Sequence, residues 1–255
     1  KAEDIINRGG GDLIIVARGA DALKALKKEL EEKYKVSVAI IIKDLSKPEA
    51  AKELYDEVAT LKVTVDYLIN NAGYGGVGRF HERKWEDDLA MINLNVVALS
   101  ALTHFYLEDM VKRNGGKILN VSSTASFMPG PMQATYFASK SFVQFLSNAI
   151  SQEIADTNVT MTNLMPGATA TKFAEVAGFK PSGMFANAFP SRGVAEDGYD
   201  GMISGKMDVL SGVSFTQRIL MMIITLMPKK MLLKAVNKMQ QDDVFTKSDL
   251  ARSGY

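Results

Sequence analysis

Two apolar runs, Leu13-Ile-Ile-Val-Ala17 and Val36-Ser-Val-Ala-Ile-Ile-Ile42, enclose a stretch whose leucines follow a helical spacing. Both runs are rich in β-branched residues, as strands buried on both faces of a sheet are. Between them, Leu23, Leu26 and Leu30 recur every three or four residues among charged side chains, which predicts an amphipathic helix over residues 21–33. Strand, helix and strand in this order predict a parallel βαβ unit.

The same alternation continues along the rest of the chain. We expect further strands at residues 65–69, 117–121, 159–164 and 207–210, and helices at 49–60, 82–113, 136–156, 194–204 and 214–241. A glycine-rich loop follows the third strand, and a loop-rich section runs from Pro166 to about Arg192. The pattern predicts one α/β domain with a doubly wound parallel sheet, in which residues 1–210 form the core and residues 211–255 a helical extension.

Composition and charge exclude several classes of site. The 255 residues contain no Cys, which excludes disulfides, thiolate zinc sites and thiol nucleophiles, and only two His, so no metal is expected. Thirty basic against 29 acidic residues give a net charge of +1, so we expect no nucleic-acid partner. The apolar run near 219–227 is shorter than the roughly 20 residues of a membrane-spanning helix, which predicts no transmembrane segment and a cytoplasmic protein.

Small or polar residues follow five of the predicted strands. They are Ala17-Arg18, Asp44-Leu45, Asn70-Asn-Ala-Gly73, Ser122-Ser123 and Pro166-Gly167. Each pair alone could be an ordinary turn. Because parallel strands end at one edge of the sheet, where ligands bind in such folds, their coincidence predicts a ligand crevice there.

Tyr136 and Lys140 lie one helical turn apart, on one face of a predicted helix. With this pair, several stretches resemble the motifs of the short-chain dehydrogenase/reductase family. They are Asn70-Asn-Ala-Gly73, Leu94-Asn-Val96, Val121-Ser-Ser123, Tyr136-Phe-Ala-Ser-Lys140 and Pro166-Gly-Ala-Thr-Ala-Thr171. The resemblance covers roughly residues 1–210 and implies a Rossmann-type, three-layer α/β/α domain that transfers hydride between a nicotinamide and a carbonyl or alcohol.

The resemblance also implies a role for each catalytic residue. Tyr136 would be the general acid and base, Lys140 would lower its pKa and hold the nicotinamide ribose, and Ser123 would hold the substrate oxygen. Asn95 would hold a water that links Lys140 to solvent, with Asn93 as the competitor for this role. Each of these residues could instead be structural: a core tyrosine, a solvated lysine, a strand-end turn or a helix irregularity.

Arg18 decides the expected cofactor. An acidic residue after the first strand would bind the adenine ribose of NAD, whereas an arginine can pair with a 2′-phosphate, so we expect NADP(H) rather than NAD(H). The resemblance implies a larger set of cofactor-binding residues. They are Arg18, Asp44, Leu45, Asn71, Ala72, Gly73, Tyr136, Lys140, Pro166, Gly167, Thr169 and Thr171.

The family's first strand and its Thr-Gly-xxx-Gly-x-Gly phosphate loop have no counterpart in the sequence. Lys1–Arg8 resembles the end of the helix that follows this loop. We therefore expect a gap in the sheet between the strands that end at Val16 and Ile69. We also expect roughly 20 to 30 further residues ahead of Lys1 in the natural protein, and the 255 residues alone to fold poorly and not to bind NADP(H).

The region after the fifth strand is apolar. Phe173, Phe179, Met184, Phe185 and Phe189 fall where the family covers its substrate, which favours a small lipophilic carbonyl or alcohol; alternatively, they close a core. Gly and Ser in the same stretch suggest a movable lid.

The tail is basic and rich in Met. Between residues 209 and 241 it has no acidic residue and five basic ones, at 218, 229, 230, 234 and 238. We weigh peripheral membrane contact through residues 213–241, a cap on an apolar pocket, and packing on the body or on a partner subunit. By resemblance, helices 82–113 and 136–156 predict a homodimer or homotetramer. The rival functions are a non-catalytic NADP-binding or regulatory protein and a peripheral membrane protein.

Overall fold

The computed structural model describes residues 11–179 and 188–243. The predicted alternation of strands and helices is confirmed throughout this part of the chain. The strands are β1 Leu13–Ala17, β2 Val38–Ile42, β3 Tyr67–Asn70, β4 Gly116–Val121, β5 Val159–Pro166, β6 Thr169–Ala170, β7 Phe189–Pro190 and β8 Asp208–Ser211. The α-helices are α2 Ala20–Tyr34, α3 Ala50–Thr60, α4 Trp85–Ile92, α5 Leu99–Lys112, α6 Ala134–Glu153, α7 Phe173–Ala177, α8 Ser191–Ile203, α9 Phe215–Ile223 and α10 Lys229–Asp243.

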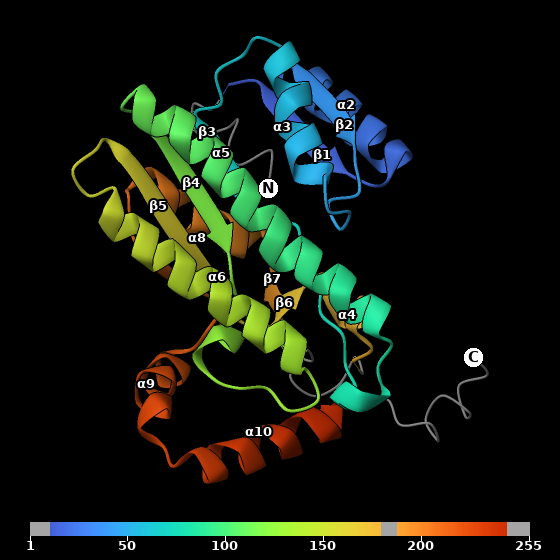
Figure 1. The fold of residues 1–255 in the computed structure, drawn as a ribbon, viewed down its shortest axis with the longest axis vertical. Helices are drawn as coiled ribbons and strands as arrows, with labels where there is room; N and C mark the ends of the chain where they lie inside the picture. Colours follow the sequence, from blue (N-terminus) through green and yellow to red (C-terminus); the bar gives the residue numbers. More distant parts are fainter. Residues whose placement is uncertain (1–10, 180–187, 244–255) are drawn as a thin grey trace.

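The main sheet has the order β3-β4-β5-β8, and all its strands are parallel. In β4, Ile118 faces a core shared with Leu102 and Met110 of α5, whereas Leu119 faces a second core with Val194 and others of α8. Both faces of the sheet are therefore covered, α5 and α6 lying on one and α8 on the other (Figure 1). This explains why the strands read as continuous apolar runs.

The strands β1 and β2 form a separate parallel pair. Helix α3 joins this pair to the main sheet, because Ala51, Leu54 and Val58 pack with Leu102 of α5 in one core. No described residue hydrogen-bonds β1 to β3. The expected gap in the sheet is thus present between these two strands.

The helix predicted over residues 82–113 is interrupted, although its apolar spacing indicated no break. Residues Asn93–Ala98 form a π-helical segment between α4 and α5. Extra residues of this kind in a helix are frequent at functional sites. The segment turns Asn95 into the interior, where its side chain has no exposed surface.

The prediction of no transmembrane segment rested on the run near 219–227, but a longer apolar helix lies elsewhere in the described chain. Residues 89–107 contain no Asp, Glu, Lys or Arg, and the helix Trp85–Lys112 is long and apolar enough to cross a bilayer. Helices in protein cores meet the same criterion. This one contributes Met91, Leu102 and Met110 to buried clusters, so its apolar residues serve the core.

The region from Pro166 to Arg192 contains more regular structure than predicted. Strand β5 continues to Pro166 because this residue pairs with Ser211 of β8. Strands β6 and β7 then pair with each other, and α7 lies between them in sequence. Met184 and Phe185, predicted to cover the substrate, lie outside the described residues, as does the stretch Lys1–Arg8.

Candidate active site

The residues singled out from the sequence gather where β3, β4 and β5 end. Tyr136 and Lys140 lie in the first turns of α6, Ser123 follows β4, and Asn71-Ala-Gly73 follows β3. Parallel pairing brings these strand ends side by side, since Asn70 of β3 lies next to Asn120 of β4. The expected crevice edge is therefore formed by adjacent strands.

Lys140 is buried, with 5% of its surface exposed. Its Nζ donates a hydrogen bond to the Val121 carbonyl oxygen at 2.8 Å, and it lies 5.9 Å from the centre of the Tyr136 ring. Burial lowers the pKa of the Lys140 ammonium to about 8. The lysine is thus held between the end of β4 and the tyrosine, with a proton that it releases around pH 8.

Tyr136 is also buried, with 8% exposed. Burial raises the pKa of its phenol to about 12, and a hydrogen bond with the Ser123 side chain acts in the opposite direction. The sequence led us to expect a pKa lowered by Lys140. In this structure burial raises the pKa instead, and the Lys140 ammonium is directed at the Val121 carbonyl oxygen. Tyr136 is accordingly a neutral phenol at physiological pH.

Asn95 connects the loop after β3 to α6, the helix that carries Tyr136 and Lys140. Its Nδ2 donates to the Tyr74 carbonyl oxygen at 3.0 Å and to Ser139 Oγ at 3.1 Å, and its Oδ1 accepts from the Tyr74 amide at 3.2 Å. A methyl group on Gly73 would lie 3.1 Å from Asn95 Oδ1 and 3.2 Å from Lys140 Nζ. Glycine at 73 therefore keeps open the space beside both side chains.

Two serines attach α6 to its neighbours, although the sequence assigned neither of them an individual role. Ser122 Oγ donates to the Lys140 carbonyl oxygen at 2.7 Å, which ties α6 to the end of β4. Ser139 Oγ donates to the Tyr136 carbonyl oxygen and accepts from Asn95. Both serines stand inside the motif stretches quoted above, but their hydrogen bonds to backbone carbonyl oxygens could not be read from the sequence.

A buried network of asparagine side chains adjoins the site, since Asn70 and Asn120 directly precede Asn71 and Val121 in the sequence. Asn70 Nδ2 donates to Asn120 Oδ1 at 2.9 Å and to Thr103 Oγ1 at 3.0 Å, and Asn120 Nδ2 donates to Ser147 Oγ at 3.0 Å. Asn120 and Ser147 have almost no exposed surface. The network joins β3 and β4 to α5 and α6 immediately beneath the reactive side chains.

The expected adenine side of the site involves Arg18 and Asp44. Asp44 Oδ1 accepts hydrogen bonds from the Ser46 backbone amide and hydroxyl, and these bonds, with a smaller contribution from Arg18, lower the pKa of its carboxyl group. Burial raises the pKa of the Tyr74 phenol, and the charge of Arg18 opposes this rise. Arg18 therefore lies on the side of the loop that follows β3. Leu45, expected at the adenine, is half-buried against the core.

Of the residues predicted to cover the substrate, Phe173 contacts Tyr136. Phe173 of α7 packs on Tyr136 with ring centres 5.2 Å apart, and a methyl group at Gly75 would lie 2.8 Å from the Phe173 ring. Phe179 is buried, as the alternative of a closed core expected, whereas Phe189 is 40% exposed.

The predicted threonines form local contacts. Thr171 Oγ1 accepts from the Phe173 amide, and Thr169 Oγ1 donates to the Gly167 carbonyl oxygen. Gly167 itself donates to Ser211, and a methyl group there would lie 2.6 Å from the Gly212 oxygen. Within the described residues no group of three His, Cys, Asp or Glu could hold a metal ion.

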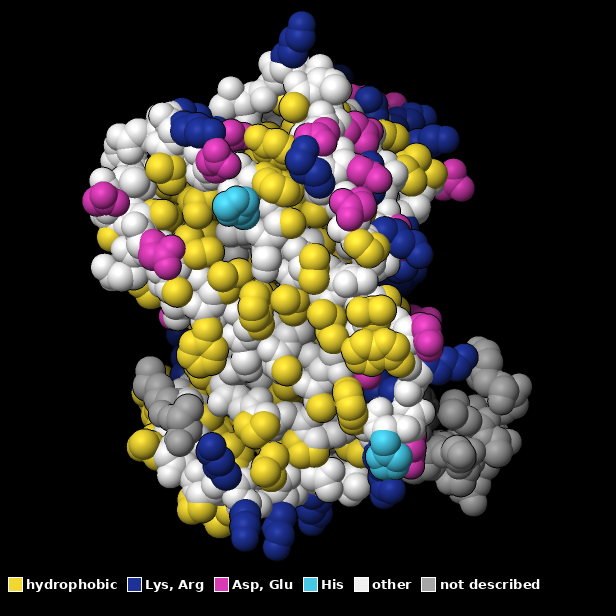
Figure 2. Space-filling view, in the orientation of Figure 1, with side chains coloured by type: hydrophobic (Ala, Val, Ile, Leu, Met, Phe, Trp, Pro, Cys, Tyr) yellow, Lys and Arg dark blue, Asp and Glu magenta, His cyan; other side chains and the backbone are white. Residues whose placement is uncertain are grey.

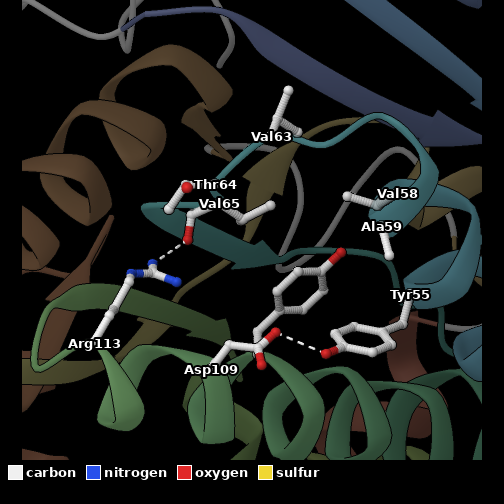
Figure 3. Close-up of a pocket in the computed structure, with 9 residues that line it drawn as sticks. Tyr55, Val58, Ala59, Val63, Thr64, Val65, Asp109 and Arg113 are labelled. Carbon is white, nitrogen blue, oxygen red and sulfur yellow. Dashed lines mark hydrogen bonds between the residues drawn. The ribbon is translucent and has the colours of Figure 1, made fainter.

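A cavity of about 310 Å³ lies far from this site (Figure 3). Tyr55 and Val58 of α3, residues 63–65 ahead of β3, and Asp109 and Arg113 near the end of α5 line it. Tyr55 donates to Asp109 at 2.7 Å across it. These residues sit at the start of β3, whereas the candidate site sits at its end. The cavity is therefore not part of the site.

Comparison with known proteins identifies the family. Residues 2–179 match the family described as short chain dehydrogenase. A very-long-chain 3-oxoacyl-CoA reductase from Homo sapiens is 30% identical over 181 residues, 69% of this chain and 56% of the relative. An inactive hydroxysteroid dehydrogenase-like protein 1, also from Homo sapiens, is 30% identical over 182 residues, 70% of this chain and 54% of the relative.

Solved structures agree with this fold. A short-chain dehydrogenase from Sphingobium yanoikuyae in complex with NADPH superposes with a TM-score of 0.77 at 25% identity, and the match covers 88% of this chain and 87% of the other. The chain spans about half the length of the curated relatives it matches. A family match over more than half of the sequence, together with its parallel sheet, shows that this chain belongs to the short chain dehydrogenase family of oxidoreductases.

Proposed function

We propose that the protein is an NADP(H)-dependent oxidoreductase that transfers a hydride between the nicotinamide and a lipophilic carbonyl compound or secondary alcohol. The observation that carries this proposal is the buried group of Asn95, Tyr136 and Lys140, in which Ser139 joins Asn95 to Tyr136 and the end of β4 holds Lys140. A protein that only bound the dinucleotide would not need a neutral tyrosine and a lysine that titrates near pH 8 in this arrangement.

The residues present fit the nicotinamide cofactor at two places. Gly73 leaves space beside Lys140, where a methyl group would be in tight contact, and Arg18 offers a guanidinium beside Asp44 for a 2′-phosphate. Asn71, Ala72, Gly73, Pro166, Gly167, Thr169 and Thr171 are proposed to line the rest of the cofactor. When bound, NADPH supplies the hydride.

Tyr136 would supply the proton. As negative charge grows on the substrate oxygen, the neutral phenol donates to it, and the pKa of about 12 keeps the phenol protonated until then. Ser123 would hold the same oxygen by a hydrogen bond. Lys140, with its pKa near 8, is placed to stabilise the phenolate that remains and to pass a proton to it through water held at Asn95.

A lipophilic substrate is favoured by what surrounds Tyr136. The Phe173 ring packs on it, and the same buried cluster contains Phe137 and Met91. The relatives named as a very-long-chain 3-oxoacyl-CoA reductase and a hydroxysteroid dehydrogenase-like protein act on, or are named for, large apolar molecules. We propose a ketone on an acyl chain or a fused-ring skeleton as the substrate class.

A homodimer or homotetramer is proposed for the assembly. On the two helices that cover one face of the sheet, Val111, Phe142 and Phe145 are exposed, Phe145 by 70%, as is Val97 in the π-helical segment before α5. Such aromatic and aliphatic side chains on adjacent helices favour a symmetric contact between copies.

The test is NADPH oxidation by the full-length protein against 3-oxoacyl thioesters of several chain lengths and steroid ketones, with NADH in parallel. We expect turnover with NADPH, a smaller rate with NADH, and a loss of about 10²–10⁴-fold in Tyr136→Phe. The alternative, a non-catalytic NADP-binding protein like the relative named inactive, predicts NADPH binding by fluorescence without turnover. Activity unchanged in Tyr136→Phe would refute the mechanism.

A further inference from the structure

The two helices after β8 present an outer side that is both apolar and basic. We call this side the tail surface. Its members are Phe215, Ile219, Leu220, Ile223 and Leu226 in and after α9, and Lys230, Met231, Lys234 and Lys238 on α10, all of them exposed. Phe215 is 76% and Leu226 82% exposed. Exposed side chains of this size on one short segment are unusual for a surface that faces only water.

The inner side of α10 is firmly attached to the body. Leu232 and Val236 form a buried cluster with Ile224, against which Phe127 and Met128 of the loop after Ser123 pack. Gln133 Nε2, at the start of the catalytic helix, donates to Gln240 Oε1 at 2.7 Å. The tail is therefore a rigid part of the domain, so its outer side has a fixed orientation.

The two sides of α10 follow the same spacing half a turn apart. Leu232, Val236 and Gln240 recur every four residues on the buried side. Lys230, Lys234 and Lys238 recur every four residues on the opposite side and are exposed. Burial of the first row thus directs the three ammonium groups outward together.

Acidic residues are absent around most of these lysines in the sequence, and the first one after them is Asp242, four residues beyond Lys238. Residues 209–241 contain no Asp or Glu, and no ion pair of the described residues involves Lys229, Lys230, Lys234 or Lys238. Figure 2 shows dark blue side chains projecting from the lower edge of the molecule, where α10 lies in Figure 1. The charge of this edge is available to an anionic partner.

We propose that the tail surface docks on an anionic lipid bilayer. Basic residues on α10 would meet the headgroups while the aliphatic and aromatic side chains of α9 enter the boundary with the acyl chains, as in helices that lie in the membrane interface. A nucleic acid would use the lysines but offers nothing to Ile219, Ile223 and Leu226. The mixed surface therefore fits lipid better than it fits a nucleic acid.

Because of the position of the tail surface, docking would also affect the candidate active site. The strands of the main sheet point toward the end of the molecule that carries α9 and α10 (Figure 1). After Ser123, Phe127 and Met128 pack against the buried cluster that contains Leu232 and Val236 of α10. Docking would thus hold the catalytic edge next to the bilayer.

Flotation with vesicles tests the proposal without measuring activity. The full-length protein is mixed with phosphatidylcholine vesicles, or with vesicles that also contain 30 mol% phosphatidylserine, at low and high salt. We expect flotation with the anionic vesicles only, weakened at high salt. Lys230→Gln/Lys234→Gln/Lys238→Gln should lower the affinity by about tenfold or more, since each lysine near an anionic surface contributes separately.

A second variant and two controls separate lipid binding from misfolding. Phe215→Ser/Leu226→Ser removes the two most exposed apolar side chains and should also abolish flotation. The controls are Lys24→Gln/Lys27→Gln/Lys28→Gln on α2, with the same loss of charge, and Phe80→Ser/Val63→Ser at other exposed apolar sites. Both controls should float like the wild type, and circular dichroism checks the fold of every variant.

Three results would overturn the proposal. They are no flotation with phosphatidylserine vesicles, flotation that both tail variants retain, and equal loss of flotation in the α2 control. Retention of an RNA or DNA 30-mer that depends on the lysines, with no flotation, would assign the surface to nucleic acid instead. None of these results bears on NADPH turnover, so the two proposals can fail independently.

Discussion

Lys140 on α6 and the lysines on the outer side of α10 place one residue type in opposite surroundings. Lys140 is buried, donates to the Val121 carbonyl oxygen and has a pKa lowered to about 8. Lys230, Lys234 and Lys238 are exposed and belong to no ion pair among the described residues. The comparison teaches that burial, not residue type, decides whether an ammonium does chemistry or offers charge to a surface.

The polar groups of the two regions differ in the same way. At the catalytic edge the side-chain amides of Asn70, Asn95 and Asn120 have named partners on strands and helices. In the contact between tail and body, Gln133 Oε1 and Gln240 Nε2 are buried and have no partner in the described structure. The catalytic edge is thus the more completely specified of the two, and each prediction below tests this contrast.

The largest effect is expected for Lys140→Met. The substitution keeps most of the side-chain volume but removes the ammonium that lies 5.9 Å from the Tyr136 ring, so kcat should fall by about 10²–10³-fold. Lys234→Met is the matched control on α10 and should leave kcat unchanged in a detergent-free assay with a soluble substrate. Steady-state kinetics measures both. Equal rates for the two variants would erase the contrast between the lysines.

The second prediction concerns stability and pH. Lys140 has a folded pKa of about 8 and an unfolded pKa of 10.5. Between these values the unfolded chain binds more protons, so the wild type should gain stability as pH rises from 8 to 10.5, by up to about 3 kcal/mol. Below pH 8 the full cost of the buried charge is present.

Urea unfolding at several pH values measures this effect as a difference between the wild type and Lys140→Met. The difference cancels other titrating groups, including Tyr136, whose raised pKa acts in the opposite direction above pH 10. The wild type should improve relative to the variant as pH rises. A difference that stays constant from pH 7.5 to 10 would show that Lys140 keeps an ordinary pKa.

The third prediction concerns the network beneath the site. Asn120→Ala removes the acceptor for the Asn70 amide and the donor to the Ser147 hydroxyl. Each of these buried groups then lacks one hydrogen-bond partner, so the free energy of unfolding should fall by about 2–3 kcal/mol. Asn158→Ala is exposed and should change it by less than about 0.5 kcal/mol. Denaturant unfolding compares them, and a small loss at Asn120 would mean that the network does not hold the strand ends.

Much of the fold could be predicted because its signals are local. The β-branched runs at 13–17 and 38–42 and the leucine spacing between them lie within single elements, and the structure has them within one or two residues of the predicted ends. The gathering of Gly73, Asn95 and Lys140 followed from motif order and parallel topology. Their roles in catalysis stay predictions until the kinetic tests.

What could not be predicted depends on contacts between distant elements. The π-helical turn at Asn95 leaves no trace in periodicity, since the apolar spacing around it reads as one continuous helix. The lowered pKa expected for Tyr136 is not found, because burial of the phenol by distant elements raises its pKa, while the Lys140 ammonium is directed at Val121 of β4. The attachment of α10 depends on a pair separated by 107 residues.

That attachment is the subject of the smallest predicted effect. Gln240→Leu removes the hydrogen bond to Gln133 and leaves the Gln133 amide buried without a partner, so the free energy of unfolding should fall by about 1 kcal/mol. Because two amide atoms of this pair already lack partners, Gln133→Leu/Gln240→Leu should restore most of that loss. Thermal unfolding of the single and double variants measures both changes. If the double variant loses more than the single one, the pair is a specific anchor that positions the catalytic helix, and the tail is as fully specified as the active site.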